Sequence, residues 1–216
     1  MGWDWAFAFE VFPVLLQGLV LTLQLTVLGS LVAFSLGLVF AVLLRGPRPV
    51  AIVVRGLIEF VRSTPLLVQV FFLFFVLPDI GIVIPPMVTG VIALGLHYAT
   101  YTADVYRAGV DAVPPGQWEA ATALSLPRAR VWTGVVLPQA IPRVLPALGN
   151  YVISMFKETP ILIAITLLDI VGWAREAGGR TFSYDEPYTI AGLLFLALSY
   201  PASLLVRRLE RRVGTI

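Results

Sequence analysis

The stretch Val14–Leu44 reads VLLQGLVLTLQLTVLGSLVAFSLGLVFAVLL and contains no charged residue. A bilayer core about 30 Å thick is crossed by a helix of roughly 20 mostly apolar residues. The stretch is longer than one crossing needs, so we expect a helix that tilts in a membrane or protrudes from it. This segment decides the expected fold class, an all-α integral membrane protein.

The composition of the whole chain agrees with that class. Hydrophobic residues make up 58% of the chain and charged residues 13%, whereas soluble domains carry roughly 25% charge. A soluble fold needs a charged surface, so we exclude one. The absence of cysteine excludes disulfides and thiol catalysis, and His97, the single histidine, excludes a multi-histidine metal site. No metal site is expected.

Five segments are expected to cross the membrane within one transmembrane domain, 1–216. They lie near residues 14–44, 57–77, 86–106, 138–156 and 188–206. The fourth is the weakest, because Pro142 and Pro146 interrupt it, but membrane helices tolerate proline when neighbouring groups satisfy the freed carbonyls.

The arginines predict the orientation of these spans. Met1–Glu10 contains no basic residue, so we expect no cleavable signal there. Basic residues follow the first, third and fifth spans: Arg45, Arg48, Arg55, Arg107, Arg128, Arg130, Arg143, Arg207, Arg208, Arg211 and Arg212. Basic loops stay in the cytoplasm, so we expect the N-terminus outside, the C-terminus in the cytoplasm and no nucleic-acid partner.

Two further features leave alternatives open. The segment Lys157–Pro187 is then mostly external, and its apolar run Ile161–Val171 is too short for a comfortable span. We expect that run to lie against the bundle or to dip into it. Small residues four apart form a stripe on the first span, namely Gly29, Ala33, Gly37 and Ala41. Such a stripe favours close helix packing within this chain, with a subunit interface as the alternative.

The loop between the third and fourth spans predicts a short helix at residues 114–126. Proline suits a first turn, as at Pro114, and the residue before Pro127 avoids helical geometry. Glu119 lies near the positive N-terminal end, where a carboxylate is favoured. Ala120 and Ala121 are small enough for the helix to lie in a partner's groove. A short interfacial helix is the alternative.

This loop resembles the EAA loop of the permeases of ATP-binding-cassette (ABC) importers. The similarity rests on Glu119-Ala120-Ala121 and on Leu137-Pro138-Gln139-Ala140. Other stretches are similar to the polar amino-acid branch of that family (histidine, glutamine and arginine types): Gly18–Thr26, Arg62–Gln69, Ile141–Asn150, Lys157–Thr159 and Leu209–Arg212. The resemblance covers nearly the whole chain from Gly18 onward. It implies a type I importer permease fold in the bacterial cytoplasmic membrane.

The resemblance also implies the partners. In that family the loop helix docks on a cytoplasmic ABC ATPase dimer, a second permease subunit (the same chain or a sister chain) completes the pathway, and an extracytoplasmic solute-binding protein delivers the substrate. The implied ATPase-coupling residues are Gly116, Glu119, Ala120, Ala121, Ser125, Leu137 and Pro138. The family pattern has glycine where this chain has Ser125.

The chain itself is not expected to be an enzyme. No stretch matches the phosphate-binding pattern G-x-x-x-x-G-K-[ST], so ATP and Mg²⁺ are expected on the partner ATPase and no cofactor on this chain. A self-sufficient secondary amino-acid carrier is the alternative function. Such a carrier more often shows internal repeats and its own ion site, and it does not need a docking helix.

Charged residues inside spans usually mark a pathway or a pair. Glu59 and Arg62 are three apart, hence on one helix face, which favours an intrahelical pair over a gate. Lys157-Glu158-Thr159 precedes Pro160, and a broken helix end with both charges suits an amino acid. A packing or hinge role is the alternative. The substrate-path candidates are Glu59, Arg62, Thr64, Pro65, His97, Lys157, Glu158 and Thr159.

Overall fold

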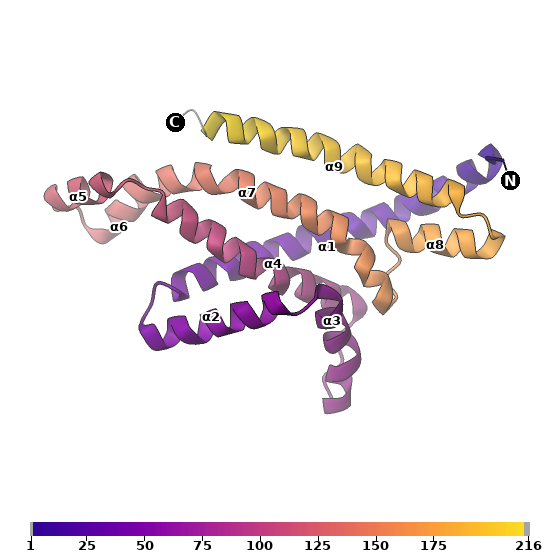
Figure 1. Cartoon of the computed structure of the whole chain (residues 1–216), viewed down its shortest axis with the longest axis horizontal. Coiled ribbons are helices and arrows are strands. Elements are labelled where there is room, and N and C mark those ends of the chain that lie inside the picture. The colour runs from indigo at the N-terminus through magenta and orange to yellow at the C-terminus, as the bar shows by residue number, and fades with distance from the viewer. Residues whose placement is uncertain (1, 214–216) are drawn as a thin grey trace.

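The computed structural model describes residues 2–213 and consists of helices, with no strand among those residues. This confirms the expected all-α class. In chain order the elements are α1 (Trp5–Leu43), α2 (Arg48–Ser63), α3 (Leu66–Phe71), η1 (Phe72–Val76), η2 (Leu77–Ile80), α4 (Pro86–Asp111), α5 (Pro115–Ala123), α6 (Arg128–Val131), η3 (Trp132–Val136), α7 (Leu137–Glu158), η4 (Thr159–Ile165), α8 (Ile170–Thr181) and α9 (Asp185–Val213). The long helices α1, α4, α7 and α9 all extend lengthwise through the molecule, and α4 is inclined to α1 (Figure 1).

The helix α1 extends beyond the uncharged run at its N-terminal end. The side chain of Asp4 caps it, accepting hydrogen bonds from the amides of Ala6 at 2.8 Å and Phe7 at 3.2 Å. Such a cap satisfies amides that have no partner in the first turn. Pro13 lies inside the helix without ending it.

The small-residue stripe of α1 packs within this chain. All four of its residues are buried. At Gly29 a Cβ would lie 2.8 Å from Sδ of Met155 and 3.3 Å from Cβ of Leu94, so α4 and α7 approach the backbone of α1 there. One turn on, the hydroxyl of Thr102 on α4 donates to the carbonyl of Ala33 at 2.9 Å. The stripe therefore serves the α1–α4 contact, which was the favoured interpretation.

The predicted span at 57–77 is not one helix. The helix α2 ends at Ser63, and the helical segment Leu66–Ile80 continues at an angle of 103° to it. Thr64 is extended (φ −104°, ψ 133°) and Pro65 has no amide hydrogen, so the hydrogen-bond ladder stops there. As a result α3 leaves the bundle almost perpendicular to α2 (Figure 1).

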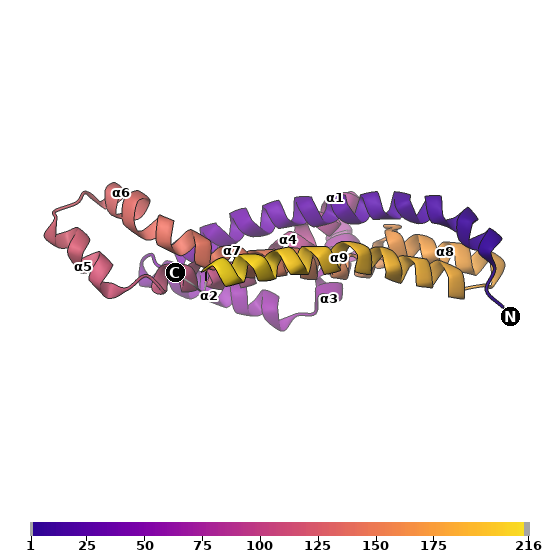
Figure 2. The ribbon, with the colours of Figure 1, turned by 90° about the horizontal axis from the view of Figure 1, so that it is seen from above.

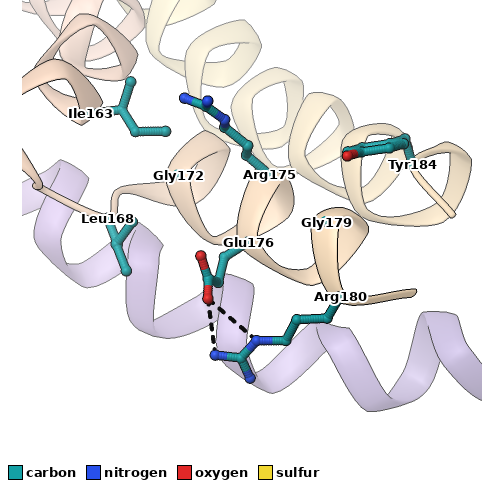
Figure 3. Close-up of a pocket in the computed structure, with 8 residues that line it drawn as sticks. All are labelled: Ile163, Leu168, Gly172, Arg175, Glu176, Gly179, Arg180 and Tyr184. Carbon is teal, nitrogen blue, oxygen red and sulfur yellow. Dashed lines mark hydrogen bonds and ion pairs between the residues drawn. The ribbon is translucent and has the colours of Figure 1, made fainter. Parts of the chain in front are cut away.

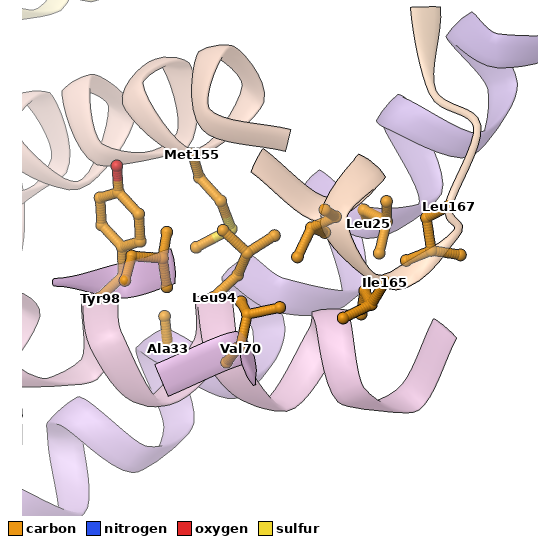
Figure 4. Packing of buried hydrophobic residues seen from close by; sticks show 11 residues of the cluster. Leu25, Ala33, Val70, Leu94, Tyr98, Met155, Ile165 and Leu167 are labelled. Atoms are coloured by element: carbon orange, nitrogen blue, oxygen red, sulfur yellow. The ribbon is translucent and has the colours of Figure 1, made fainter. Parts of the chain in front are cut away.

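The apolar run Ile161–Val171 dips into the bundle. It forms η4 up to Ile165, turns at Thr166, whose φ is 69°, and then enters α8. Leu162 and Ile165 are fully buried. They join the main core, to which α1 contributes Leu25, α3 Val70, α4 Leu94 and α7 Met155 (Figure 4). Packing of this kind, rather than exclusion of water, holds helices together in a membrane.

The two ends of the bundle differ. The helices α5 and α6 project beyond the long helices at one end, where α9 also ends, whereas the start of α1 and α8 lie at the opposite end (Figure 2). Among residues 2–213 two helices, Trp5–Leu43 and Asp185–Arg212, are long and apolar enough to cross a membrane, and up to four spans result if each of two bent pairs counts as one.

Candidate functional site

The helix α5 forms inside the predicted segment 114–126. Pro114 is its N-cap and Pro115 its first residue. It ends in a Schellman motif: the amide of Ser125 donates to the carbonyl of Thr122 at 2.9 Å, and the amide of Leu126 donates to that of Ala121 at 3.1 Å. This motif requires a left-handed residue, and Ser125 adopts a φ of 51°. Ser125 thus occupies a conformation that favours glycine.

One face of α5 packs on the protein and the other is free. Ala121 is buried, and the ring of Trp118 meets that of Trp132 edge to face at 5.6 Å. The remaining candidates of the loop, Gly116, Glu119, Ala120, Ser125, Leu137 and Pro138, are exposed. Leu124, which the sequence analysis did not single out, is 72% exposed at the end of the helix. The free face is thus small, acidic at one point and apolar at its tip.

Two arginines fasten the base of this loop. Arg45, after α1, forms an ion pair with Asp111 and donates to the carbonyl of Arg107 at 3.3 Å. Arg143 of α7 donates to the carbonyl of Ala112. Guanidinium groups suit a helix C-terminus, where carbonyls have no partner in the helix. The end of α4 is therefore held from both sides.

A second group of polar side chains lies where α2, α4 and α7 meet. Arg62 does not pair with Glu59, so the expected intrahelical pair is wrong. Instead its Nη2 lies 2.6 Å from Oδ2 of Asp104 and also donates to the carbonyl of Thr100. The guanidinium carbon lies 4.9 Å from the ring centre of Tyr101. The arginine side chain is long enough to reach the neighbouring helix α4, which offers both the carboxylate of Asp104 and the carbonyl of Thr100 as acceptors.

Three tyrosines with mutually tilted rings cluster beside this arginine. The ring centre of Tyr101 is 6.3 Å from that of Tyr98 and 5.9 Å from that of Tyr151. The phenol of Tyr98 lies near the side chains of Glu158 and Ser154. The sequence analysis missed these tyrosines. Tyr98 and Tyr101 are three apart on α4, a spacing that places both rings on one face and was the available signal.

The bend after α2 brings further candidates to the same place. Nδ1 of His97 on α4 is 3.2 Å from Nε2 of Gln69, and the same Nε2 is 2.9 Å from the hydroxyl of Thr64. Pro65 follows directly. Four of the candidates, namely Arg62, Thr64, Pro65 and His97, are therefore within one cluster, together with Gln69, which was not predicted.

The segment after α7 divides its three candidates. Lys157 and Glu158 are exposed, whereas Thr159 is fully buried. The hydroxyl of Thr159 lies 3.1 Å from Oδ2 of Asp169, whose other oxygen accepts from the amide of Gly172 at 2.9 Å. Thr159 therefore faces the interior and fastens η4 to α8. Among residues 2–213 no three histidine, cysteine, aspartate or glutamate side chains are placed to hold a metal ion.

The opposite end of the molecule carries an open cleft of ≈490 Å³ along α8. Figure 3 shows Glu176 turned toward Arg180, whose Nη2 lies 3.0 Å from Oε1, while Arg175 points to the other side. Gly172 and Gly179 contribute no side chain to the lining, and Tyr184 lies at the far end. The cleft is lined by charged and apolar residues together and lies at the end of the molecule opposite α5.

Comparison with known proteins places this geometry in a family. Residues 33–215 match the family described as "binding-protein-dependent transport system inner membrane component". The probable amino-acid ABC transporter permease protein y4tG of Sinorhizobium fredii is 50% identical over 204 residues, which cover 94% of this chain and 88% of that protein. The arginine transport system permease protein ArtQ of Bacillus subtilis is 33% identical over 99% of this chain and 98% of its own length.

Solved structures agree. A chain from the crystal structure of an amino acid ABC transporter with histidines has a TM-score of 0.91 and 36% identity, covering 98% of this chain and 100% of its own. A chain of the MetNI methionine transporter has a TM-score of 0.76 at 20% identity and shows the fold alone. The chain therefore belongs to the family of inner membrane components of binding-protein-dependent transport systems, as the permease subunit of an ABC importer and not as an enzyme.

Proposed function

We propose that this permease subunit carries polar amino acids inward across the bacterial cytoplasmic membrane through five spans, near 14–44, 57–77, 86–106, 138–156 and 188–206. The N-terminus is outside and the C-terminus is in the cytoplasm. The arginines at the α5 end of the bundle support this orientation, because basic loops stay in the cytoplasm. The helix α4 supports the count: its 26 residues measure about 39 Å, enough for one crossing.

The helix α5 is the ATPase-coupling element. It projects from the cytoplasmic end of this topology with Glu119 and Ala120 exposed (Figure 2). An exposed helix with small side chains fits a groove on a partner. The partner is a dimer of ABC ATPases that binds ATP and Mg²⁺, and a second permease subunit completes the pathway. The cleft along α8 lies at the outer end, where the solute-binding protein delivers the substrate.

The substrate class rests on the relatives and on the polar cluster. The relatives named above are amino-acid and arginine permeases, and the structure at 36% identity holds histidines. In this chain Glu158, Arg62 and His97 supply both charges and ring nitrogens around the tyrosines, and Lys157 precedes Glu158 in the chain. A zwitterionic ligand needs an anion for its ammonium and a cation for its carboxylate. Glu59, Thr64 and Pro65 complete the proposed path.

One observation carries the proposal: α5 stands free of the bundle at the end where the arginines gather. The test co-expresses the chain with an ABC ATPase and measures ATPase pull-down and ATP-dependent amino-acid uptake into vesicles. We expect Glu119→Lys to lose both. The matched control is Glu210→Lys on α9, the same charge reversal at the same end of the bundle but off the loop, which keeps both.

The outcomes separate the two candidate functions. Uptake by the wild-type chain without any ATPase, or a Glu119→Lys variant that still binds and transports, contradicts the coupling role and favours a self-sufficient secondary carrier. The relatives reported above are ABC permease subunits, so that alternative finds no support among them.

A further inference from the structure

The bend between α2 and α3 interrupts the regular helical hydrogen bonds, although the carbonyl of Val61 still accepts from the amide of Thr64 at 3.3 Å and from its hydroxyl at 3.0 Å. α2 stops at Ser63, and Pro65 has no amide hydrogen to offer the preceding turn. In the proposed topology this break lies within the second span, where no water is at hand to bond a freed carbonyl. A break of this kind persists in a membrane only when another group supplies the missing donors.

The side chain of Gln69 supplies a donor in addition to those of Thr64. Its Nε2 lies 2.7 Å from the carbonyl oxygen of Val61 and 2.9 Å from that of Thr64. Gln69 sits on α3, beyond the break, whereas Val61 belongs to the last turn of α2. The amide therefore reaches back across the bend and joins the two helices through acceptors that the break exposed.

The same nitrogen fixes the orientation of the amide and reaches α4. Rotating the amide by half a turn would bring Oε1 against the carbonyls of Val61 and Thr64, so the nitrogen must face them. Nδ1 of His97, 3.2 Å away, then acts as an acceptor, with the ring hydrogen on Nε2. This tautomer is assigned from the hydrogen-bond network. The His97 ring in turn lies 5.4 Å from the ring of Tyr101 and 5.6 Å from that of Tyr98.

From this chain of contacts we infer that Gln69 is a positioning residue of the translocation path: its amide replaces the hydrogen bonds lost at Pro65, fixes the α2–α3 bend and orients His97 beside the tyrosines. The inference rests on the proposed function for the path, but the bend itself is measured without transport. The two amide hydrogens of Gln69 face four acceptors, namely the carbonyls of Val61 and Thr64, the hydroxyl of Thr64 and Nδ1 of His97. The hydrogen bonds are therefore shared or exchanged among these acceptors, and one can break while the amide stays in place.

The first experiment reads the bend. The sequence contains no cysteine, so Ile52→Cys and Ile80→Cys, which are 69% and 71% exposed, accept spin labels on either side of the break. The label distance is measured by electron paramagnetic resonance in the whole complex in nanodiscs, diluted with unlabelled complex. Gln69→Leu removes both donors at similar volume. Gln69→Glu keeps the shape and turns an oxygen toward the two carbonyls.

We expect both variants to shift or broaden the label distance, while the control Gln24→Leu leaves it unchanged. Gln24 is an exposed glutamine on the spanning helix α1, so it controls for the loss of an amide from a span. If the distance distribution of Gln69→Leu matches that of the wild type, the Gln69 amide does not fix the α2–α3 bend and the inference is wrong.

The second experiment tests the action through His97. In proteoliposomes containing the full transporter, Gln69→Leu lowers amino-acid uptake per complex roughly tenfold, as expected for the loss of about one net hydrogen bond. ATPase binding is unchanged. Combining it with His97→Leu adds no further loss, because both changes break one link. Additive losses contradict the positioning role. Absence of uptake by the wild type contradicts the proposed function. The label distances still test whether the Gln69 amide fixes the α2–α3 bend.

Discussion

Arg62, at the end of α2, forms an ion pair with Asp104 of α4, with Nη2 2.6 Å from Oδ2. The pair joins the helix that precedes the bend to the helix that carries His97. Its side chains are 22% and 49% exposed, so the interaction is partly screened and we expect a coupling energy of about 1 kcal/mol.

A double-mutant cycle of Arg62→Leu and Asp104→Asn measures that coupling in the thermal unfolding of the purified complex. The matched control is the pair Arg180–Glu176 on α8, a single-helix pair at 3.0 Å with side chains 72% and 46% exposed. We expect about 0.5 kcal/mol or less there. Equal coupling in the two cycles contradicts a special role for Arg62.

Replacing Ser125 by glycine should stabilise the loop that contains α5. Its φ of 51° is unfavourable for a residue with a Cβ by about 1 kcal/mol, and Ser125→Gly removes that strain. We expect slower proteolysis of the loop and ATPase binding that is equal or tighter. Ser125→Ala, which keeps the Cβ, is the control and should show no gain. Faster proteolysis of Ser125→Gly than of the wild type would falsify the strain argument.

Gly18 sets the distance between α1 and the start of α8. A Cβ there would lie 2.6 Å from the carbonyl oxygen of Asp169, a backbone atom that cannot rotate away. Gly18→Ala therefore forces the two segments apart, and we expect it to destabilise the fold by roughly 1–3 kcal/mol. Thermal unfolding in detergent measures the change.

Gly192 on α9 is the control for that substitution. No atom lies within 4 Å of a Cβ at this position, and the residue is helical. Gly192→Ala should stabilise the helix slightly, by up to about 1 kcal/mol, because alanine has the higher helix propensity. The prediction for Gly18 is wrong if the two alanine variants unfold at the same temperature.

Glu186 makes the end of the bundle opposite α5 sensitive to acid. It precedes the proposed span 188–206, its side chain is nearly fully buried, and its pKa lies below the ordinary value because the amide of Asp4 donates to Oε1 at 2.8 Å and the hydroxyl of Ser183 to Oε2 at 2.7 Å. A lowered folded-state pKa means that the carboxylate stabilises the fold above the unfolded pKa, near 4.5, and that this stabilisation is lost as the pH falls through the folded pKa.

The unfolding temperature measured between pH 7 and pH 3 tests this. We expect the wild type to lose stability below about pH 4.5, and Glu186→Gln to be less stable at neutral pH with a shallower acid slope. Asp185→Asn, a change at the neighbouring exposed position, is the control and should keep the acid slope of the wild type. An unchanged slope in Glu186→Gln contradicts the assignment.

The parts that depend on local sequence were predictable. The uncharged run Val14–Leu44 predicted α1, and Pro114 predicted where α5 starts, because both depend on residues close together in the chain. The effect of Pro65 was not predictable in that way. Pro13 lies inside α1 and Pro201 inside α9 without a break, so a proline alone does not decide whether a membrane helix stops.

What decides at Pro65 is the set of hydrogen bonds that its neighbours form, including the one between Gln69 and the distant His97. Gln69 and the extended Thr64 make the break tolerable, and the spacing of these residues does not reveal it. The same holds for Arg62, whose spacing from Glu59 suggested a pair on one helix while its carboxylate lies 42 residues further along the chain. Thr159 likewise turned inward because Asp169, ten residues away, is buried beside it. Tertiary contacts of this kind have no periodic signature.

The two arginines at the base of α5 have a mechanical consequence. Arg45 ties the end of α4 to the turn after α1, and Arg143 ties it to α7. The chain itself ties α5 to α4 on one side and, through α6 and η3, to α7 on the other. A force applied to α5 therefore acts on several attachments to the bundle rather than on a single flexible hinge. It is shared among three of the long helices at once, so a displacement of α5 is passed directly to a tilt of the bundle.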